Sequence, residues 1–191
     1  MCYYSNMKKT PNFSWMNPDL EVRNIKGFGK GIFAKKDFKK DTILTIFGGY
    51  VMTRLEEEKL KAPFNDYAHQ IAPSFVIGIR KRGELQPVDF YNHSCNPNAG
   101  FKGQIFLVAM RNIKKEEQVT FDYGMVLMKT PGLKIQYKLK KCMCGSKNCR
   151  QTITVNDWKI PDLQKRYNGY FQWYIQSKVD KINRSSKLYL G

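Results

Sequence analysis

Residues 89–98 read DFYNHSCNPN and form a polar segment on which the assignment of the fold depends. Asn, His, Ser and Cys side chains gather here, whereas apolar runs flank the segment on both sides. The segment is too polar for a core strand and is rich in turn-forming residues. His93 is one of only two histidines in the chain, and a lone histidine is more often structural than a ligand or a base. The segment is therefore informative only together with the patterns around it.

Short apolar runs surround this segment and are separated by Gly, Asn and Lys, a pattern that predicts many short strands. The runs are LEVRNI (20–25), GIFA (31–34), TILTIFGGYV (42–51), YAHQI (67–71), FVIGI (75–79), QIFLVAM (104–110) and EQVTFDY (117–123). Strict alternation in LKIQYKLK (133–140) predicts a further, half-buried strand. The expected fold class is therefore mainly β, a β-rich α+β fold.

Helices are expected in two places. RLEEEKLKA (54–62) predicts one exposed helix that is anchored by Leu55 and Leu60 and ends before Pro63. A helical period over 161–183 predicts one or two C-terminal helices with a break at Asn168-Gly169. The residues that share this period are Leu163, Tyr167, Tyr170, Tyr174 and Val179. Residues from 184 onward carry no periodic signal and are expected to fray.

Composition limits the classes of protein to consider. The chain has 191 residues, 42% of them hydrophobic, which suits one domain with extensions and an ordinary core. No apolar run approaches the ~20 residues of a membrane helix, and the N-terminal residues lack the apolar stretch of a signal peptide. The 33 Lys and Arg exceed the 16 Asp and Glu and give a formal net charge of +17, which attracts any polyanion. We therefore expect an intracellular, reducing location without membrane contact.

A cluster of cysteines predicts a metal site. CMCGSKNC (142–149) holds three of the five cysteines in the chain. Three thiolates this close suit a tetrahedral Zn²⁺ ion, and without a secretion signal they are more typical of a metal site than of disulfides. A fourth ligand has to come from elsewhere, and Cys95 and Cys2 are the remaining thiols.

Two further patterns are weak when each is taken alone. GFGKGIFA (27–34) has three alternate glycines, which allow a backbone to approach a ligand closely, but a tight turn is the commoner explanation. VTFDYG (119–124) ends a strand with Tyr123 just before a glycine, and such a tyrosine usually caps the edge of a core. Neither pattern indicates a function without the others.

Taken together and in this order, GFGKGIFA, NHSCNPN, VTFDYG and CxCGxxxC resemble the motifs of SET-domain protein lysine methyltransferases with a post-SET zinc loop. The resemblance covers about residues 20–150, and residues 157–182 are similar to the helical ending of small stand-alone bacterial SET proteins. It implies small curved sheets around a threaded pseudoknot, in which the NHS and FDY segments pass each other. The implied division is an N-terminal tail (1–18), a SET domain (19–125), a post-SET zinc-binding region (126–151) and a C-terminal helical extension (152–191).

The resemblance also implies the chemistry and the residues that carry it. S-adenosylmethionine is the implied cosubstrate, and its methyl group passes through a narrow channel to the amine of a substrate lysine. Tyr123 is the implied catalytic tyrosine, and Phe121 occupies the phenylalanine/tyrosine switch position, where Phe leaves room for more than one methyl group. The implied cofactor-binding residues are Gly29, Lys30, Gly31, Asn92 and His93. The implied Zn²⁺ ligands are Cys95, Cys142, Cys144 and Cys149, which leaves Cys2 free.

The chain departs from the family pattern at one wall of the channel. Phe47-Gly48-Gly49-Tyr50 stands where the family has Tyr-x-Gly-Glu, so a channel tyrosine is missing or displaced. Tyr50, Tyr67 and Tyr91 are the alternatives that could replace it.

The expected partner is a protein that presents a lysine, such as a histone tail, with non-specific nucleic-acid contact through the basic surface. The expected location is the cytoplasm, or the nucleus if the protein acts on eukaryotic chromatin. The alternative is a basic, zinc-containing nucleic-acid or chromatin binding module without catalysis, in which Lys-faced strands and C-terminal aromatics make the contacts. This alternative does not explain why three separate motifs occur in family order.

Overall fold

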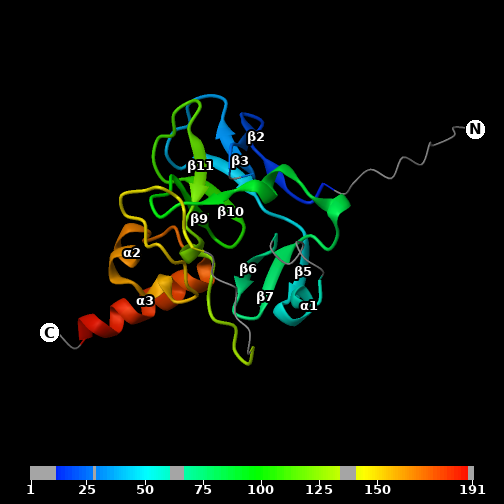
Figure 1. Ribbon diagram of the computed structural model, residues 1–191. Helices are drawn as coiled ribbons and strands as arrows, with labels where there is room; N and C mark the ends of the chain where they lie inside the picture. Colours follow the sequence, from blue (N-terminus) through cyan, green and yellow to red (C-terminus); the bar gives the residue numbers. More distant parts are fainter. Residues whose placement is uncertain (1–11, 28, 61–66, 134–140, 189–191) are drawn as a thin grey trace, which may run out of the picture.

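Short strands dominate the computed structural model, which describes residues 12–27, 29–60, 67–133 and 141–188 (Figure 1). The strands form three small sheets. The first runs, in spatial order, β1 (Trp15–Met16), β4 (Ile43–Ile46), β10 (Phe106–Ala109) and β9 (Ala99–Lys102). The second runs β2 (Leu20–Ile25), β3 (Gly29–Ala34), β11 (Gln118–Phe121) and β8 (Asn92–His93). The third runs β5 (Tyr50–Thr53), β7 (Phe75–Gly78) and β6 (His69–Ala72), and the predicted mainly β fold of small sheets is confirmed.

The second sheet contains the pairing that matters for function. β11 pairs with β3 in the antiparallel sense, but with β8 in the parallel sense. Thr120 lies opposite Asn92, and Phe121 lies opposite His93. The polar segment and the strand that leads to Tyr123 therefore lie side by side, although about 30 residues of chain separate Tyr123 from His93.

The run at 42–51 makes two strands because Phe47, Gly48 and Gly49 form a bend between them. A Cβ atom on Gly48 would lie 1.8 Å from the carbonyl oxygen of Phe13, and Gly49 has a φ of +142°. Both positions accept only a residue without a side chain. The bend directs the chain from β4, in the first sheet, to β5, in the third.

The expected helix over 54–62 is described only as α1 (Arg54–Glu58), and its anchors differ from the prediction. Thr53 begins the helix with a capping box in which its hydroxyl accepts the Glu56 N–H and the Glu56 carboxylate accepts the Thr53 N–H. This start turns Arg54 and Glu57 into the protein, where they form a buried ion pair. Leu55 is consequently 62% exposed, so its assignment as an anchor is wrong.

The two C-terminal helices are confirmed, with a break between them. They are α2 (Pro161–Arg166) and α3 (Trp173–Leu188), and Leu163, Tyr167, Tyr174 and Val179 are buried as predicted. The expected fraying is wrong for residues 184–188, because α3 continues to Leu188, and residues 189–191 lie outside the described ranges. Nucleation is the costly step of helix formation, so a helix whose first turns are held by packing can extend by further residues. The predicted strand at 133–140 falls almost entirely on 134–140, which lie outside the described residues.

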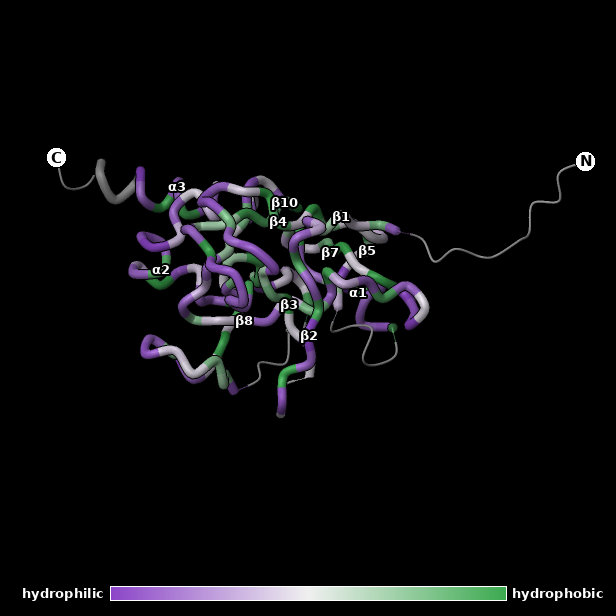
Figure 2. The backbone as a smooth tube through the Cα atoms, turned by 90° about the horizontal axis from the view of Figure 1, so that it is seen from above, coloured by the Kyte–Doolittle hydropathy of each residue, from purple (hydrophilic) through white to green (hydrophobic). Residues whose placement is uncertain are grey.

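The C-terminal helices pack into the same core as the sheets. One cluster of buried residues contains Ile32 and Phe101 from the strands together with Tyr167, Phe171 and Ile175. Viewed from above, α2 and α3 lie at one end of the molecule, and β5, β7 and α1 lie at the other (Figure 2). Short 3-10 helices η2 (Arg82–Glu84), η3 (Pro87–Phe90), η4 (Tyr123–Met125) and η5 (Asp157–Lys159) connect these parts. No helix within the described ranges is both long and apolar enough to cross a membrane.

Candidate functional site

Asn92 joins the glycine-rich strand β3 to β8. Its side-chain N–H donates to the carbonyl oxygen of Lys30 at 2.8 Å. A Cβ atom added to Gly31 would lie 2.9 Å from that same amide nitrogen and 2.6 Å from the side-chain nitrogen of Gln118. Gly31 is therefore crowded by the ends of neighbouring side chains, whereas Gly29 has a φ of +80° and open space around it. Four of the residues predicted to bind the cofactor, 29–31 and Asn92, are thus brought together.

His93, the fifth of these residues, uses both ring nitrogens within the protein. Nδ1 accepts the main-chain N–H of Tyr123 at 3.1 Å, and Nε2 lies 3.2 Å from Sγ of Cys95. Burial lowers the pKa of this imidazole, so the neutral form is favoured. The ring therefore contacts Tyr123 on one side and the cysteine cluster on the other, which leaves the main chain of His93 for the cofactor.

Tyr123 and Phe121 lie together, with their ring centroids 5.3 Å apart. The Tyr123 hydroxyl donates to the main-chain carbonyl oxygen of Tyr91 at 3.4 Å, and its ring lies 5.1 Å from that of His93. Tyr123 opens η4, and the Asp122 carboxylate caps that turn by accepting the Gly124 N–H at 2.8 Å. The tyrosine is thus held at its main chain, at its ring and at its hydroxyl.

A cluster of packed aromatic rings continues from Phe121 into the molecule. The Phe121 ring lies 5.2 Å from Phe101 and 6.3 Å from Tyr91, and Phe47 lies 5.9 Å from each of those two rings. The Tyr91 hydroxyl is buried and shares a hydrogen bond of 2.7 Å with Thr45. Neither Phe47 nor Phe121 carries a hydroxyl, so most of this wall is apolar.

Of the three tyrosines considered as replacements for a channel tyrosine at Phe47, Tyr91 has its ring beside both Phe47 and Phe121. Tyr50 instead lies under the guanidinium of Arg80 and donates to Glu84, and Tyr67 packs against Phe90.

His69 is part of this aromatic cluster and was not singled out from the sequence. Its ring lies 4.5 Å from Phe47 and 6.2 Å from Phe101, and its Nε2 is buried without a hydrogen-bond partner among the described residues. Burial lowers the pKa of His69 to about 4, so the ring is neutral near pH 7. A histidine within a predicted strand run, YAHQI, was the available signal.

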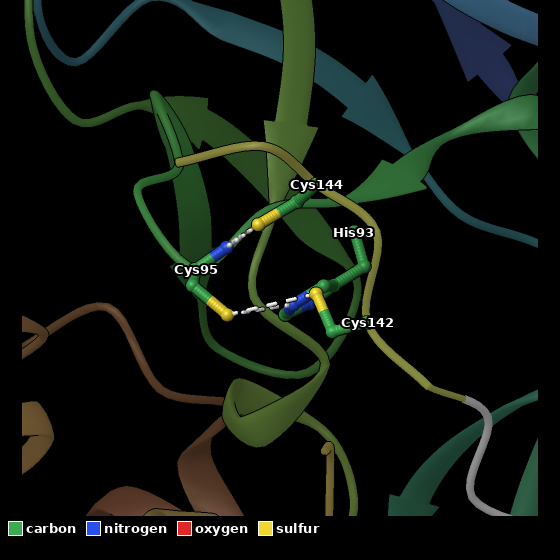
Figure 3. A group of neighbouring side chains, drawn as sticks. All are labelled: His93, Cys95, Cys142 and Cys144. Atoms are coloured by element: carbon green, nitrogen blue, oxygen red, sulfur yellow. Dashed lines mark hydrogen bonds between the residues drawn. The ribbon is translucent and has the colours of Figure 1, made fainter. Parts of the chain in front are cut away.

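Three of the predicted metal-binding cysteines meet at one point together with His93. The donor atoms of His93, Cys95, Cys142 and Cys144 all lie within 4.8 Å of one another, and their side chains face a common centre (Figure 3). Two sulfur ligands of a tetrahedral zinc ion, each ~2.3 Å from the metal, lie ~3.8 Å apart. The Sγ atoms of Cys95 and Cys142 are 3.8 Å apart. The donor set and its spacing fit Zn²⁺.

Cys149 lies beside this cluster. Its Sγ is 3.8 Å from the carbonyl oxygen of Cys142, and it packs against the same buried residues. The four closest donors therefore include His93 where the sequence predicts Cys149. Cys2 lies outside the described residues.

The thiols of the cluster differ in their readiness to ionise. Burial raises the pKa of Cys95 to about 11 and raises that of Cys142 as well. Burial also opposes ionisation of Cys144, but donors from Ser146 and the main-chain N–H of Cys95 outweigh it and lower the pKa of that thiol to about 6. A bound metal cation would lower the pKa of each coordinating thiol, because it stabilises the thiolate directly.

The sequence and the fold match one family. A family model described as SET domain matches residues 29–124. A histone-lysine N-methyltransferase of Mycosarcoma maydis, named as H3 lysine-36 specific, is 26% identical over 148 residues, which are 71% of this chain and 14% of that protein.

Two solved structures show the same fold. One is SUVH6 of Arabidopsis thaliana in complex with SAM, which matches with a TM-score of 0.58 and 19% identity over 73% of this chain and 33% of that one. The other is KRYPTONITE in complex with mCHH DNA, H3(1-15) peptide and SAH, which matches with a TM-score of 0.54 and 24% identity over 73% of this chain and 30% of that one. This chain thus spans at most a third of the length of each of these three proteins.

Proposed function

The chain belongs to the SET domain family, and on this basis we propose that it transfers methyl groups from S-adenosylmethionine to the side-chain amine of protein lysines. The observation that carries the proposal is the parallel pairing of β8 with β11. It sets the group of Asn92, Lys30 and Gly31 on one side of the pair and the proposed lysine pocket at Tyr123 and Phe121 on the other. A direct methyl transfer requires the methyl group and the amine to meet in line, and the proposed meeting point is beside Tyr123.

The cofactor is proposed to bind along β3, at Gly29, Lys30 and Gly31, and at Asn92 and the main chain of His93. The missing side chain at Gly31 keeps the Asn92 amide in contact with the Lys30 carbonyl oxygen. S-adenosylmethionine supplies an electrophilic methyl group on a sulfonium sulfur. The protein has to align that methyl group with an amine and exclude water.

The lysine is proposed to enter the pocket as a neutral amine. Its reference pKa is ~10.4, and removal from water beside the positive sulfonium group disfavours the ammonium form. The amine nitrogen forms a bond to the methyl carbon, the carbon–sulfur bond breaks, and its electron pair stays on sulfur. Tyr123 orients the amine, and oxygen atoms at this point attract the polarised methyl group through weak C–H···O contacts.

Phe121 favours the addition of more than one methyl group. A tyrosine hydroxyl at this position would take up space and hold a water beside the amine, whereas the phenylalanine ring leaves that volume to a methylated amine. We therefore propose that the products include di- or trimethyl-lysine.

Zinc is proposed to bind Cys95, Cys142 and Cys144, with Cys149 or His93 as the fourth ligand. When bound, the ion supplies folding energy to a loop that has little hydrophobic core of its own. Cys95 belongs to the polar segment and the other cysteines to residues 142–149, so their common site ties the two together.

Histones are the proposed substrate class. The relative from Mycosarcoma maydis is named for lysine 36 of H3, and the KRYPTONITE structure contains an H3 peptide and DNA. The net charge of +17 supports an approach to nucleosomal DNA. A nuclear or chromatin location follows from this substrate, and a cytoplasmic one follows if another lysine-bearing protein is the substrate.

The test is a transfer assay with methyl-labelled S-adenosylmethionine on core histones, nucleosomes and a cell lysate. We expect label on histones with the wild-type protein and at least about a 100-fold lower rate with Tyr123→Phe, since one positioned hydroxyl is lost. Absence of label on every substrate, with salt-sensitive DNA binding retained, would favour the non-catalytic chromatin module instead.

A further inference from the structure

The carboxylate next to Tyr123 is shared by three separate parts of the chain. Asp122 is fully buried, and it caps the turn that begins with Tyr123. The two terminal nitrogens of Arg150 donate to its two oxygens at 2.6 and 2.7 Å, a bidentate arrangement that fixes the plane of the carboxylate. The turn that presents Tyr123 is therefore held from outside its own strand.

Arg150 belongs to the cysteine loop, because it directly follows Cys149. Its main-chain N–H points to Sγ of Cys95 at 3.4 Å, and its Nε donates to Asp157 at 3.0 Å. Arg150 thus contacts a proposed zinc ligand through its main chain, and the carboxylate beside Tyr123 and η5 through its guanidinium. Movement of the loop would withdraw both donors from Asp122 at once.

The C-terminal helices supply the third contact through Tyr167 at the end of α2. This residue is 1% exposed, and its hydroxyl donates to Asp122 at 3.0 Å and also lies 3.3 Å from the carbonyl oxygen of Cys95. The neighbouring Arg166 donates to the same carbonyl oxygen at 2.9 Å. The end of α2 therefore contacts both the carboxylate and the polar segment that bears Cys95.

We propose that Tyr167 and Arg150 are positioning residues that, through Asp122, couple closure of the cysteine loop to the placement of Tyr123. The inference rests on the proposed methyltransferase function. Neither residue touches the reacting atoms, so both act through Asp122 and the turn of η4. The C-terminal helices then take part in catalysis without contributing a group to the pocket.

The test compares Tyr167→Phe with Tyr170→Phe in the full zinc-bound chain. Tyr170 is a matched control because it lies in the same C-terminal segment and its hydroxyl also donates to an aspartate, Asp41, but at an exposed site outside this network. Two experiments are done: steady-state kinetics of methyl transfer, which gives kcat and KM, and the rate at which a chromogenic chelator removes zinc.

We expect Tyr167→Phe to lower kcat by about 10- to 100-fold with KM for cofactor and peptide within about twofold, because small misplacements of an aligned group act on the chemical step. We also expect faster zinc release than from the wild type. Tyr170→Phe should change neither quantity. Arg150→Lys keeps the charge but loses the bidentate contact, so it should also lower kcat and speed zinc release. It replaces Tyr167→Phe in the test if that variant does not fold.

A Tyr167→Phe protein that matches Tyr170→Phe in either kcat or zinc release would overturn the coupling. So would a uniform rise in KM at unchanged kcat, or a wild-type protein that is active without zinc. Wild-type protein that binds zinc but methylates nothing would instead count against the proposed function. The zinc-release rates would in that case still decide whether Tyr167 holds the loop.

Discussion

Gly31 has no side chain, and three neighbouring side chains occupy the space that a methyl group would need. The added Cβ would lie 2.6 Å from Gln118 and Ile25 and 2.9 Å from Asn92. All three contacts are made by the ends of side chains, so the fold can yield while the Asn92 amide moves off the Lys30 carbonyl oxygen. Gly31 is therefore a sensitive probe of the proposed cofactor site.

Gly31→Ala should raise KM for S-adenosylmethionine about five- to tenfold, the equivalent of losing one hydrogen bond of about 1 kcal/mol. Calorimetric titration of the cofactor and steady-state kinetics both measure this change. Gly83→Ala is the matched control, because nothing lies within 4 Å of a Cβ atom there and the φ angle is ordinary. Equal cofactor affinity in the two variants would remove Gly31 and Asn92 from the cofactor site.

Phe121 is expected to control the number of methyl groups. Phe121→Tyr adds a hydroxyl among the rings of Phe101, Tyr91 and Tyr123, which reduces the volume for a methylated amine. The products should shift from di- and trimethyl-lysine to monomethyl-lysine, with the first transfer slowed by no more than about tenfold. Mass spectrometry of a methylated peptide measures the distribution.

Phe75→Tyr adds the same hydroxyl at an exposed position on β7 and should leave the products unchanged. An unaltered product distribution in Phe121→Tyr would show that this ring does not border the amine.

His69 on strand β6 is buried in the aromatic cluster. Its burial makes the free energy of unfolding depend on pH. The folded protein lowers the pKa of His69 to about 4 from an ordinary value of 6.5. Between about pH 6.5 and pH 4, His69 is protonated in the unfolded chain but neutral in the folded chain. This residue therefore makes the free energy of unfolding fall as pH falls. Its contribution is fully restored above pH 6.5.

His69→Phe should remove that loss. Between about pH 7 and about pH 5 the wild type should lose roughly 2 kcal/mol more of its free energy of unfolding than the variant does, as measured by urea unfolding. Asp89, whose pKa burial raises to about 6, has the opposite sign, since its contribution is lost as pH rises, but it is present in both proteins and cancels in the difference. Parallel pH profiles would mean that His69 is solvated in the folded state.

The sequence predicts the elements better than it predicts their contacts. Apolar runs locate β2, β3, β6, β7, β10 and β11 to within a few residues, because strand periodicity is a local property. The prediction of Leu55 as an anchor fails because a cap at Thr53 sets which face of α1 is buried, and that face carries an ion pair.

The site shows the same division between local motifs and contacts across the chain. The order of the motifs identifies Asn92, His93, Tyr123 and the cysteines as candidate site residues, because each motif is a short local stretch of sequence. The roles of Asp122, Arg150 and Tyr167 depend on contacts that cross from β11 to the cysteine loop and to α2. No spacing in one sequence reveals such contacts, although an arginine directly after the last cysteine and an aspartate directly before Tyr123 were visible.

One hydrophobic core extends from the strands into the C-terminal helices. Ile175 on α3 is fully buried in the cluster that also contains Ile32 and Phe101. Ile175→Ala should therefore lower the free energy of unfolding by about 2–5 kcal/mol, as expected for a large core residue. Ile182→Ala on the same helix, where the side chain is 44% exposed, should cost within about 0.5 kcal/mol.

Urea unfolding followed by fluorescence and by activity measures both variants. Similar small costs for the two variants would mean that α3 folds independently of the sheets.

The basic surface and the proposed active site serve the molecule differently. The charge of +17 is a long-range attraction that brings a polyanion near, whereas the pocket selects the atom that reacts. Salt should therefore weaken action on nucleosomes far more than action on a short histone peptide.

The decisive measurement is tandem mass spectrometry of histone H3 after incubation with S-adenosylmethionine and either wild-type protein or Tyr123→Phe. We predict methyl groups on the side-chain nitrogen of one or a few lysines, with di- or trimethylated forms present, and almost none with the variant. Methyl groups on another type of residue, or equal modification by the two proteins, would contradict lysine methylation at the pocket of Tyr123 and Phe121.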